Sequence, residues 1–405
     1  MAYLRTLVAA LCLWPALNNA ALAFDVQAGS AFVKDMNTGT VLLKKNADVP
    51  LPPASMSKLM TLYVTFEAIR EGRLTLDEEL SVSEHAMSFG GSTMFLDTTD
   101  RVSVEDLLRG IIVLSGNDAC VVLAEALSPD GTEVGFARFM TERARQMGMN
   151  QSVFLNSSGW PEEGHVMSMR DLGILAERII VDFPEYYPMF AETEFAFDGR
   201  APKNVRNRNP LLELDIGADG LKTGHTQEAG YGLVGSAIQG DRRVIFVVSG
   251  IDTVAQRARE TEALINWSFR QFTEAKIASA GEEVSRADVW MGSAGTVGLA
   301  PAEDLVTMIP ILSSGPLAAE IVYNGPIEAP IEAGAPIAEM VISPEGMPEM
   351  RVPLLASEAV SRGGFGVRLK TVSGLLFRRA LQGVVEEADQ SDGQGSDSEE
   401  AGDAS

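Results

Sequence analysis

The segment from Ser55 to Arg70 constrains the fold more than any other part of the chain, because the helix it predicts is apolar on nearly every face. The apolar residues in it are Leu59, Met60, Leu62, Tyr63, Val64, Phe66 and Ile69. A helix without a polar face must be buried in a larger domain. The chain has 405 residues, of which 46% are apolar, so it is long enough for two or three domains with sizeable cores.

The N-terminus predicts a secretory signal peptide over residues 1–23. Arg5 precedes an apolar run from Leu7 to Leu17, and the small-residue triplet Ala21-Leu22-Ala23 places the expected cleavage before Phe24. A membrane anchor would need roughly 20 apolar residues. The N-terminal run has too few, and no other stretch is long and apolar enough to span a bilayer. Cleavage removes Cys12, so the exported chain keeps only Cys120 and forms no internal disulfide.

The formal charge of −24, from 32 basic and 56 acidic residues, argues against a nucleic-acid partner, which needs a basic face. Eight of the acids lie in residues 386–405, which contain no basic residue and predict a disordered tail. His85, His165 and His225 are dispersed, and with one cysteine in the exported chain no metal-ligand spacing exists. We therefore expect neither a metal nor a cofactor.

The rest of the sequence divides into a mixed helix-and-strand region over 24–275 and a small all-β region over 276–365. In the first region we expect the strands Ser30–Lys34 and Thr40–Lys44 to form a hairpin around Asn37-Thr38-Gly39, and Tyr231–Ile238 to form a second hairpin with Arg243–Val248 around Gly240-Asp241. We expect helices over Leu107–Leu114, Asp118–Leu127, Arg170–Asp182 and Thr253 to about Phe272. Ser103 and Asp106 form a capping-box pattern before the second helix. Short apolar runs broken by Pro and Gly are typical of the second region.

The first candidate site is Ser55-Met56-Ser57-Lys58, at the start of the buried helix. Residues three apart share a helix face, so we expect the amine of Lys58 against the hydroxyl of Ser55. A serine becomes a strong nucleophile when a base takes its proton, and a lysine is that base only when burial or a neighbouring cation keeps it neutral. Taken alone, the pattern favours a capping serine and a surface lysine.

Two further short motifs follow in the sequence. Ser115-Gly116-Asn117 lies in a break between two apolar helices, where loops often present side chains to a cleft. Lys222-Thr223-Gly224 leads into the Tyr231–Ile238 strand and offers a cation, a hydroxyl and close backbone approach. Ser-Gly-Asn is common as a turn and is uninformative by itself, whereas the Lys-Thr-Gly triplet is expected by chance only about 0.1 times in a chain of this composition.

The three motifs in this order resemble those of the serine penicillin-interacting enzymes. The longer segments around the motifs are similar to those of the low-molecular-mass D-alanyl-D-alanine carboxypeptidases of the penicillin-binding protein 5/6 type. These segments are Pro53–Thr61 around the first motif, Met94-Phe95-Leu96 with Val102–Leu107 and Ser115–Ala119 around the second, and Asp219–Thr226 around the third. The resemblance covers about Ala28–Leu355. It implies an α/β (α+β) transpeptidase/β-lactamase-like domain, with a central antiparallel sheet and helices, followed by a small all-β domain.

The resemblance also implies roles for the motif residues. Ser55 would attack the carbonyl between the two terminal D-alanines of a peptidoglycan stem peptide, and Lys58 would accept its proton. The backbone N–H groups of Ser55 and His225 would form the oxyanion hole. Ser115 and Lys222 would relay the proton to the leaving D-alanine, after which water would hydrolyse the acyl-enzyme.

Further residues would bind the substrate. Asn117 would hydrogen-bond the substrate amide, and Thr223, next to Gly224, would hold the terminal carboxylate together with Arg257. Arg208 belongs to a segment that the family has near the cleft, although its alignment needs a one-residue gap. β-Lactams, which mimic the D-alanyl-D-alanine end, would acylate the same serine.

The resemblance places the exported protein in the periplasm. Residues 366–385 include Val372–Val385, an apolar run beside Arg378-Arg379 that predicts an amphipathic helix. Two interpretations stay open: the helix anchors the protein on the inner-membrane surface, or it packs on the protein. The acidic tail over 386–405 would be repelled by anionic lipids.

The sequence argues against three other functions. A β-lactamase of the most similar class has Asp where Gly116 stands and a catalytic glutamate on a later loop, where Phe154–Ser158 has none; Glu162 and Glu163 are interpreted as surface acids. Gly230–Gly235 matches a dinucleotide fingerprint, but the turn at Gly240-Asp241 predicts a strand after it rather than the required helix. A non-catalytic wall-binding or scaffold protein would not need all three motifs.

Overall fold

The computed structural model describes residues 24–312 and 317–366, which form two compact units. The first unit is built mainly from residues 24–273 and the second mainly from the described residues that follow. The predicted signal peptide, the C-terminal helix and the acidic tail lie outside the described residues. Within the described ranges, no helix is long and apolar enough to cross a membrane.

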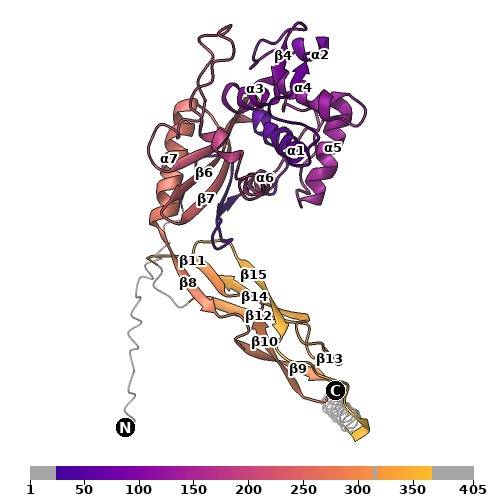
Figure 1. Ribbon diagram of the computed structural model, residues 1–405. Coiled ribbons are helices and arrows are strands. Elements are labelled where there is room, and N and C mark those ends of the chain that lie inside the picture. Colours follow the sequence, from indigo (N-terminus) through magenta and orange to yellow (C-terminus); the bar gives the residue numbers. More distant parts are fainter. Residues whose placement is uncertain (1–23, 313–316, 367–405) are drawn as a thin grey trace, which may run out of the picture. The chain divides into compact units, whose positions relative to one another are not determined.

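The first unit contains a five-stranded antiparallel sheet in the order β2-β1-β7-β6-β5 (Figure 1). Its strands are β1 (Ser30–Asp35), β2 (Val41–Lys45), β5 (Ala218–Thr226), β6 (Gly230–Gln239) and β7 (Arg242–Ile251). Both predicted hairpins are confirmed: Gly39 (φ 71°) and Gly240 (φ 61°) supply the left-handed turn conformations that a side chain disfavours.

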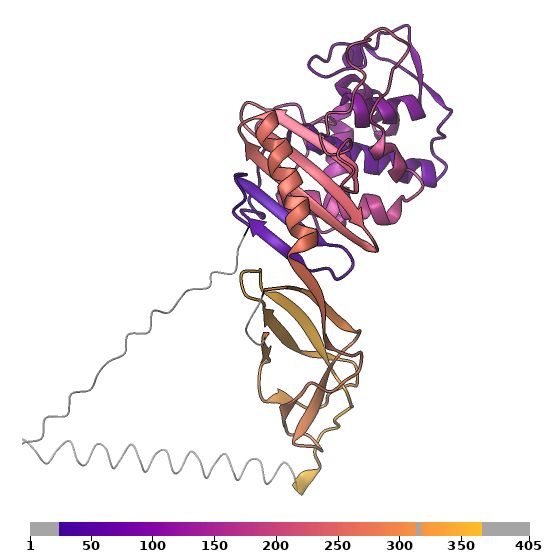
Figure 2. The ribbon, with the colours of Figure 1, turned by 90° about the vertical axis from the view of Figure 1, so that its left-hand side faces the viewer.

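Helices cover both faces of this sheet. Successive side chains of a strand point to opposite faces, so each strand contributes apolar side chains to the core on either side of the sheet. On β1, Ala31 and Val33 pack with Leu264 and Ile265 of α7 (Val254–Arg270), which lies along one face in Figure 2. Phe32, between them, points to the opposite face and joins the larger helical core. The sheet is therefore the central layer of the first unit.

The helix predicted to be buried, α1 (Lys58–Arg70), lies in the middle of the helical layer, and its residues from Lys58 to Ala68 are buried. It contacts α4 (Asn117–Leu127), α5 (Glu133–Gln146) and α6 (Met169–Asp182). The smaller elements of this layer are η1 (Ala54–Ser57), β3 (Glu79–Ser81), α2 (Glu84–Met87), β4 (Arg101–Ser103), α3 (Val104–Arg109), the π-helical turn η2 (Gly110–Leu114) and η3 (Tyr187–Ala191).

The structure differs from the sequence expectations at four places. Ser55 lies in the 3₁₀ turn η1 rather than in the helix itself, and the predicted helix over Leu107–Leu114 changes to a π-helical turn at Gly110. Helix α5, capped by the hydroxyl of Thr132, was not predicted, although Phe136, Met140 and Ala144 recur at helical spacing and form its buried face. Lys222 lies on a strand of its own, β5, rather than in a lead-in to the next strand.

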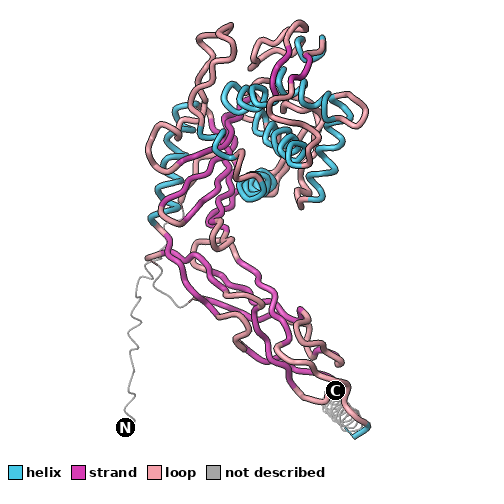
Figure 3. The backbone as a smooth tube through the Cα atoms, in the orientation of Figure 1, coloured by secondary structure: helices cyan, strands magenta, loops and turns pink. Residues whose placement is uncertain are grey.

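The second unit consists of strands, drawn in magenta in Figure 3, which confirms the predicted all-β region. Its six-stranded sheet has the order β12-β14-β15-β10-β9-β13, and β8 pairs with β11. The strands are β8 (Phe272–Ala278), β9 (Ser285–Trp290), β10 (Thr296–Pro301), β11 (Leu305–Pro310), β12 (Ala318–Val322), β13 (Ile327–Glu328), β14 (Pro336–Ser343) and β15 (Met350–Ala356).

Phe66 tests how far the first unit depends on the buried face of α1. Its ring is fully buried and lies 5.5 Å from Phe183 and 5.0 Å from Tyr186, centroid to centroid. Phe66→Ala removes these contacts and leaves a cavity, so we expect the free energy of unfolding to fall by about 3–5 kcal/mol. Urea unfolding followed by circular dichroism measures this. The exposed control Val181→Ala should change stability by less than about 0.5 kcal/mol, and equal effects would contradict the prediction.

Candidate active site

Ser55 projects from a sharp turn between the sheet and helix α1. Ala54, just before it, has a left-handed backbone (φ 49°), which is uncommon for a residue with a side chain and stores local strain. The loop carrying Gly159 packs directly on this turn: a Cβ atom at Gly159 would lie 1.9 Å from the carbonyl oxygen of Ala54. The surrounding backbone therefore holds Ser55 in place, at the junction of two cavities.

Lys58 is fully buried and lies against Ser55, as the spacing predicts. Its Nζ donates to Ser55 Oγ at 3.0 Å and to the carbonyl oxygen of Ser158 at 2.6 Å. Burial, with a smaller contribution from the positive charge of Arg208, lowers the pKa of Lys58 to about 8. About a tenth of Lys58 is therefore neutral at pH 7, and this neutral fraction can act as the general base for Ser55.

A second serine–lysine pair joins the other two motifs. Lys222 Nζ, on β5, donates to Ser115 Oγ at 3.0 Å although the two residues are 107 positions apart. Burial is the main cause that lowers the pKa of Lys222 well below its usual value, and the positive charge of Lys58 lowers it further. Two buried amines thus flank the site, each bonded to a serine hydroxyl, and such an arrangement can pass a proton along.

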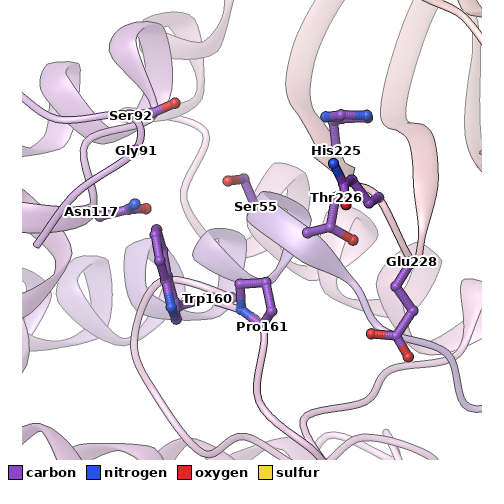
Figure 4. Close-up of a pocket in the computed structure, with 11 residues that line it drawn as sticks. Ser55, Gly91, Ser92, Asn117, Trp160, Pro161, His225, Thr226 and Glu228 are labelled. Carbon is purple, nitrogen blue, oxygen red and sulfur yellow. The ribbon is translucent and has the colours of Figure 1, made fainter.

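The backbone around Ser115 orients Asn117. Ser115 has a left-handed conformation (φ 64°) that ends the π-helical turn and lets α4 begin at Asn117. The Asn117 backbone N–H donates to Ser92 O at 2.7 Å, and its Nδ2 donates to Gly90 O at 2.8 Å. Figure 4 shows the Asn117 amide facing the cavity beside Ser55, where it can meet a substrate amide.

The carboxylate of Asp118 holds the adjoining loop, a role that the sequence analysis missed. It accepts hydrogen bonds from the backbone N–H groups of Met94, Leu96 and Ala119. Burial raises its pKa, and these backbone donors act against that shift. Asp118 therefore fixes the segment at 92–97, which includes Ser92 at the edge of the cleft.

A cavity of about 440 Å³ on one side of Ser55 is rich in positive charge. Its lining includes Ser115, Thr223, Gly224, His225, Arg208 and Arg257. Arg257, on α7, is 5% exposed. Its guanidinium donates to the carbonyl oxygens of Arg208 (3.1 Å) and Gly232 (3.5 Å) and lies over the Tyr231 ring, 5.8 Å from its centroid. A buried cation that makes no ion pair among the described residues suits an anionic substrate group.

Arg208 lies at the same cavity but is held differently. Its side chain is exposed, and its NH1 donates to Ser92 Oγ at 2.6 Å, so it links the β5 side of the cleft to the 92–97 segment. Arg208, whose alignment with the family needs a one-residue gap, therefore lies at the cleft. Its predicted contact with substrate stays a prediction.

Gly224 and His225 have distinct surroundings on β5. A Cβ atom on Gly224 would lie 3.0 Å from Met56 Cγ and 3.1 Å from the carbonyl oxygen of Pro53, so glycine permits β5 to approach the nucleophile turn. The His225 ring stacks on Tyr231 with centroids 3.8 Å apart. The predicted oxyanion role of the Ser55 and His225 backbone N–H groups stays a prediction; both residues line both cavities.

The segment over 155–166 supports the nucleophile, and sequence reasoning did not identify it. His165 Nδ1 accepts from the Leu155 backbone N–H at 3.3 Å, so the hydrogen on Nε2 is directed to Ser57 Oγ at 2.8 Å. Burial, together with the charge of Lys58, lowers the pKa of His165 to about 4 and keeps the ring neutral. No sequence pattern links residues 108 positions apart, so this contact had no signal.

Glu133 completes the support of that segment. One of its carboxylate oxygens accepts from both the backbone N–H and the hydroxyl of Ser157, at 2.9 and 2.6 Å. The other lies 2.9 Å from His85 Nε2. Helix α5, which carries Glu133, therefore positions the loop whose next residue, Ser158, binds Lys58. The described residues hold no group of three or more acidic, histidine or cysteine side chains that could bind a metal.

Comparison with known proteins agrees with this geometry. Residues 17–253 match the family model described as D-alanyl-D-alanine carboxypeptidase, and residues 272–362 match the model of the penicillin-binding protein 5 C-terminal domain. The chain belongs to the D-alanyl-D-alanine carboxypeptidase family. The fingerprint-like glycines at 230–235 lie on strand β6, so the dinucleotide-binding interpretation does not apply.

Individual members of the family cover most of the chain. The D-alanyl-D-alanine carboxypeptidase DacD of Escherichia coli is 34% identical over 353 residues, which are 85% of this chain and 90% of the relative. The crystal structure of penicillin-binding protein 5 from Haemophilus influenzae has a TM-score of 0.68 at 33% identity, covering 83% of this chain and 98% of that one. Penicillin-binding protein D2 of Listeria monocytogenes, solved with ampicillin bound, has a TM-score of 0.55 at 32% identity over 61% of this chain and 99% of that one.

The pKa of Lys58 predicts how acylation depends on pH. Lys58 must be neutral to accept the proton of Ser55, so its active fraction rises about tenfold per pH unit below a pKa of about 8 and levels off above it. We expect the second-order rate constant for acylation by a fluorescent penicillin to follow this curve. Lys58→Arg, whose guanidinium stays protonated, should lose the reaction at every pH. A rate constant that is flat from about pH 6 to about pH 9 would contradict the assignment.

Proposed function

We propose that this chain is an exported serine carboxypeptidase that removes the terminal D-alanine from peptidoglycan stem pentapeptides in the periplasm and so takes part in cell-wall remodelling. One observation carries the proposal. Ser55 is hydrogen-bonded to Lys58, whose lowered pKa makes the neutral amine accessible, and Ser55 shares a cavity with Arg257, a buried cation that forms no ion pair with any residue the structure describes. Family membership supports the reaction type.

In the acylation step, Ser55 Oγ attacks the carbonyl carbon of the penultimate D-alanine while Lys58 Nζ takes the hydroxyl proton. The negative charge that develops on the carbonyl oxygen is stabilised by the backbone N–H groups of Ser55 and His225. The peptide C–N bond then breaks, and the leaving amine of the terminal D-alanine takes the proton that Lys58 accepted, relayed through Ser115 and Lys222, so that Lys58 is neutral again. An ester on Ser55 Oγ remains.

Deacylation restores the enzyme. Water adds to the ester carbonyl, the bond to Ser55 Oγ breaks, and the serine regains its proton from the water. Throughout acylation, Thr223 and Arg257 hold the terminal carboxylate and Asn117 holds a substrate amide. A β-lactam with its own carboxylate fits the same contacts, and its ring opens when Ser55 attacks.

Substitution of the nucleophile tests this mechanism. Ser55→Ala removes the attacking oxygen, so we expect fluorescent penicillin labelling to disappear and D-alanine release from a pentapeptide ending in D-Ala-D-Ala to fall by at least about ten-thousandfold. The exposed Ser293→Ala should keep both activities, and circular dichroism verifies that both variants fold.

The outcomes discriminate between functions. Labelling that survives in Ser55→Ala would overturn the nucleophile assignment. Rapid penicillin turnover without D-alanine release would indicate a β-lactamase instead. Glu162, the acid weighed for that role, accepts a hydrogen bond from Asn156 Nδ2 at 3.2 Å, and the structure gives it no contact with Ser55.

Localisation and anchoring have their own test. We propose that residues 1–23 direct export and that the helix predicted over Val372–Val385 attaches the protein to the inner-membrane surface. The full-length chain should then fractionate with membranes. A chain ending at Gly364 should appear in the soluble periplasmic fraction, because it lacks the apolar helix face. Equal membrane association of the two would exclude the helix as the anchor. Recovery of either in the cytoplasm would contradict export.

A further inference from the structure

A second cavity, of about 530 Å³, opens on the other side of Ser55 from the basic one. Its lining is Ser55, Gly91, Ser92, Asn117, Gly159, Trp160, Pro161, His225, Thr226, Gln227 and Glu228. Figure 4 shows Trp160 and Pro161 along one wall and Glu228 beyond Thr226. None of these last three residues has a role in the mechanism above. We call this space the acyl-side cavity.

The acyl-side cavity and the basic cavity differ in charge. Arg208 and Arg257 line the basic cavity, whereas the charged side chain that lines the acyl-side cavity is Glu228. Glu228 is exposed, and no hydrogen bond or ion pair joins it to another described residue. Glu162, which lines an adjoining hollow with Glu228, is engaged by Asn156. Glu228 is therefore the acid available to a ligand.

The aromatic wall of the acyl-side cavity is built rather than incidental. The Trp160 backbone N–H donates to Asn156 Oδ1 at 3.1 Å, and its ring meets that of Phe89 edge-on, with centroids 6.3 Å apart. A Cβ atom on Gly91 would lie 3.0 Å from the Trp160 ring, so glycine at 91 makes room for it. The side chain nevertheless stays 45% exposed and presents apolar surface to the cavity.

The direction of the substrate follows from the two cavities. With the terminal carboxylate at Arg257 and the attacked carbonyl at Ser55, the residue that precedes the D-Ala-D-Ala pair must enter the acyl-side cavity. An extended chain advances roughly 3.3–3.6 Å per residue, so this residue lies in the first part of the cavity. A long side chain can then rest its methylene groups on Trp160 and Pro161 and extend its end toward Glu228.

We propose that Glu228, with Trp160 and Pro161, forms a specificity subsite for a side chain with a free terminal amine on the residue that precedes the D-Ala-D-Ala pair. This inference rests on the carboxypeptidase function proposed above. The subsite selects among stem peptides by charge: an unmodified amine is favoured, and an amine that is acylated, as in a cross-linked or capped peptide, loses the attraction.

Two matched peptides test the subsite, N-acyl-L-lysyl-D-Ala-D-Ala with a free ε-amine and the same peptide with that amine acetylated. We expect the intact enzyme to release D-alanine from the free-amine peptide with a kcat/KM about threefold to fivefold higher, the upper part of the range of a solvent-exposed ion pair. Raising the salt concentration should shrink the difference, because it screens exposed charges. Glu228→Gln should abolish the preference without changing the rate of penicillin acylation.

Two further variants sharpen the test. Glu163→Gln removes an equal charge from a neighbouring exposed acid outside the cavity lining and should keep the preference. Glu228→Lys should reverse it, favouring a peptide whose ε-amine is succinylated. Equal rates on the two peptides, or a preference that persists in Glu228→Gln, would overturn the subsite and leave the carboxypeptidase function standing. D-alanine release from neither peptide would overturn both.

Discussion

The burial of the Lys58 amine is the constraint on which the active site depends. A fully buried ammonium is costly, so the site must either pair it with an anion or make its neutral form accessible. This chain does the second: Lys58 meets only the hydroxyl of Ser55 and the carbonyl oxygen of Ser158, and its pKa falls to about 8. The apolar helix α1 is what makes this environment, because a buried helix carries its first residue into the core.

The rest of the first unit brings distant backbone segments to this amine. Gly159 lets one loop touch the nucleophile turn, and Gly224 lets strand β5 approach it from the other side. Glu133 and His165 then hold the loop over 155–166 by hydrogen bonds that form only in the folded chain. A Cβ added at Gly159 would overlap the Ala54 carbonyl oxygen, and one added at Gly224 would crowd Met56 and Pro53. Sterics and hydrogen bonding together therefore set these positions.

The cleft also differs from the average electrostatics of the chain. The formal charge of −24 describes the whole sequence, yet the cavity on one side of Ser55 is lined by Arg208 and Arg257. Lys222 adds a further basic group there through its hydrogen bond to Ser115, which lines the same cavity. The other side is lined by Glu228. Charge inside a cleft acts over a few ångströms in a low dielectric, so this local polarity, not the net charge, governs which end of a substrate lies where.

The sequence by itself determined several elements and one contact between reacting groups. The buried helix, both hairpins and the all-β region follow from residue patterns within each segment, and the contact between Ser55 and Lys58 follows from their spacing along one helical turn. Residue roles beyond that came from resemblance to a family. Helix α5 was missed although its buried residues Phe136, Met140 and Ala144 have helical spacing. No pattern linked His165 to Ser57 or Glu133 to its loop. Only the tertiary structure decided these contacts and the cavity at Glu228, because packing joins residues 24 positions apart (Glu133 and Ser157) or 108 apart (Ser57 and His165), where local propensity carries no information.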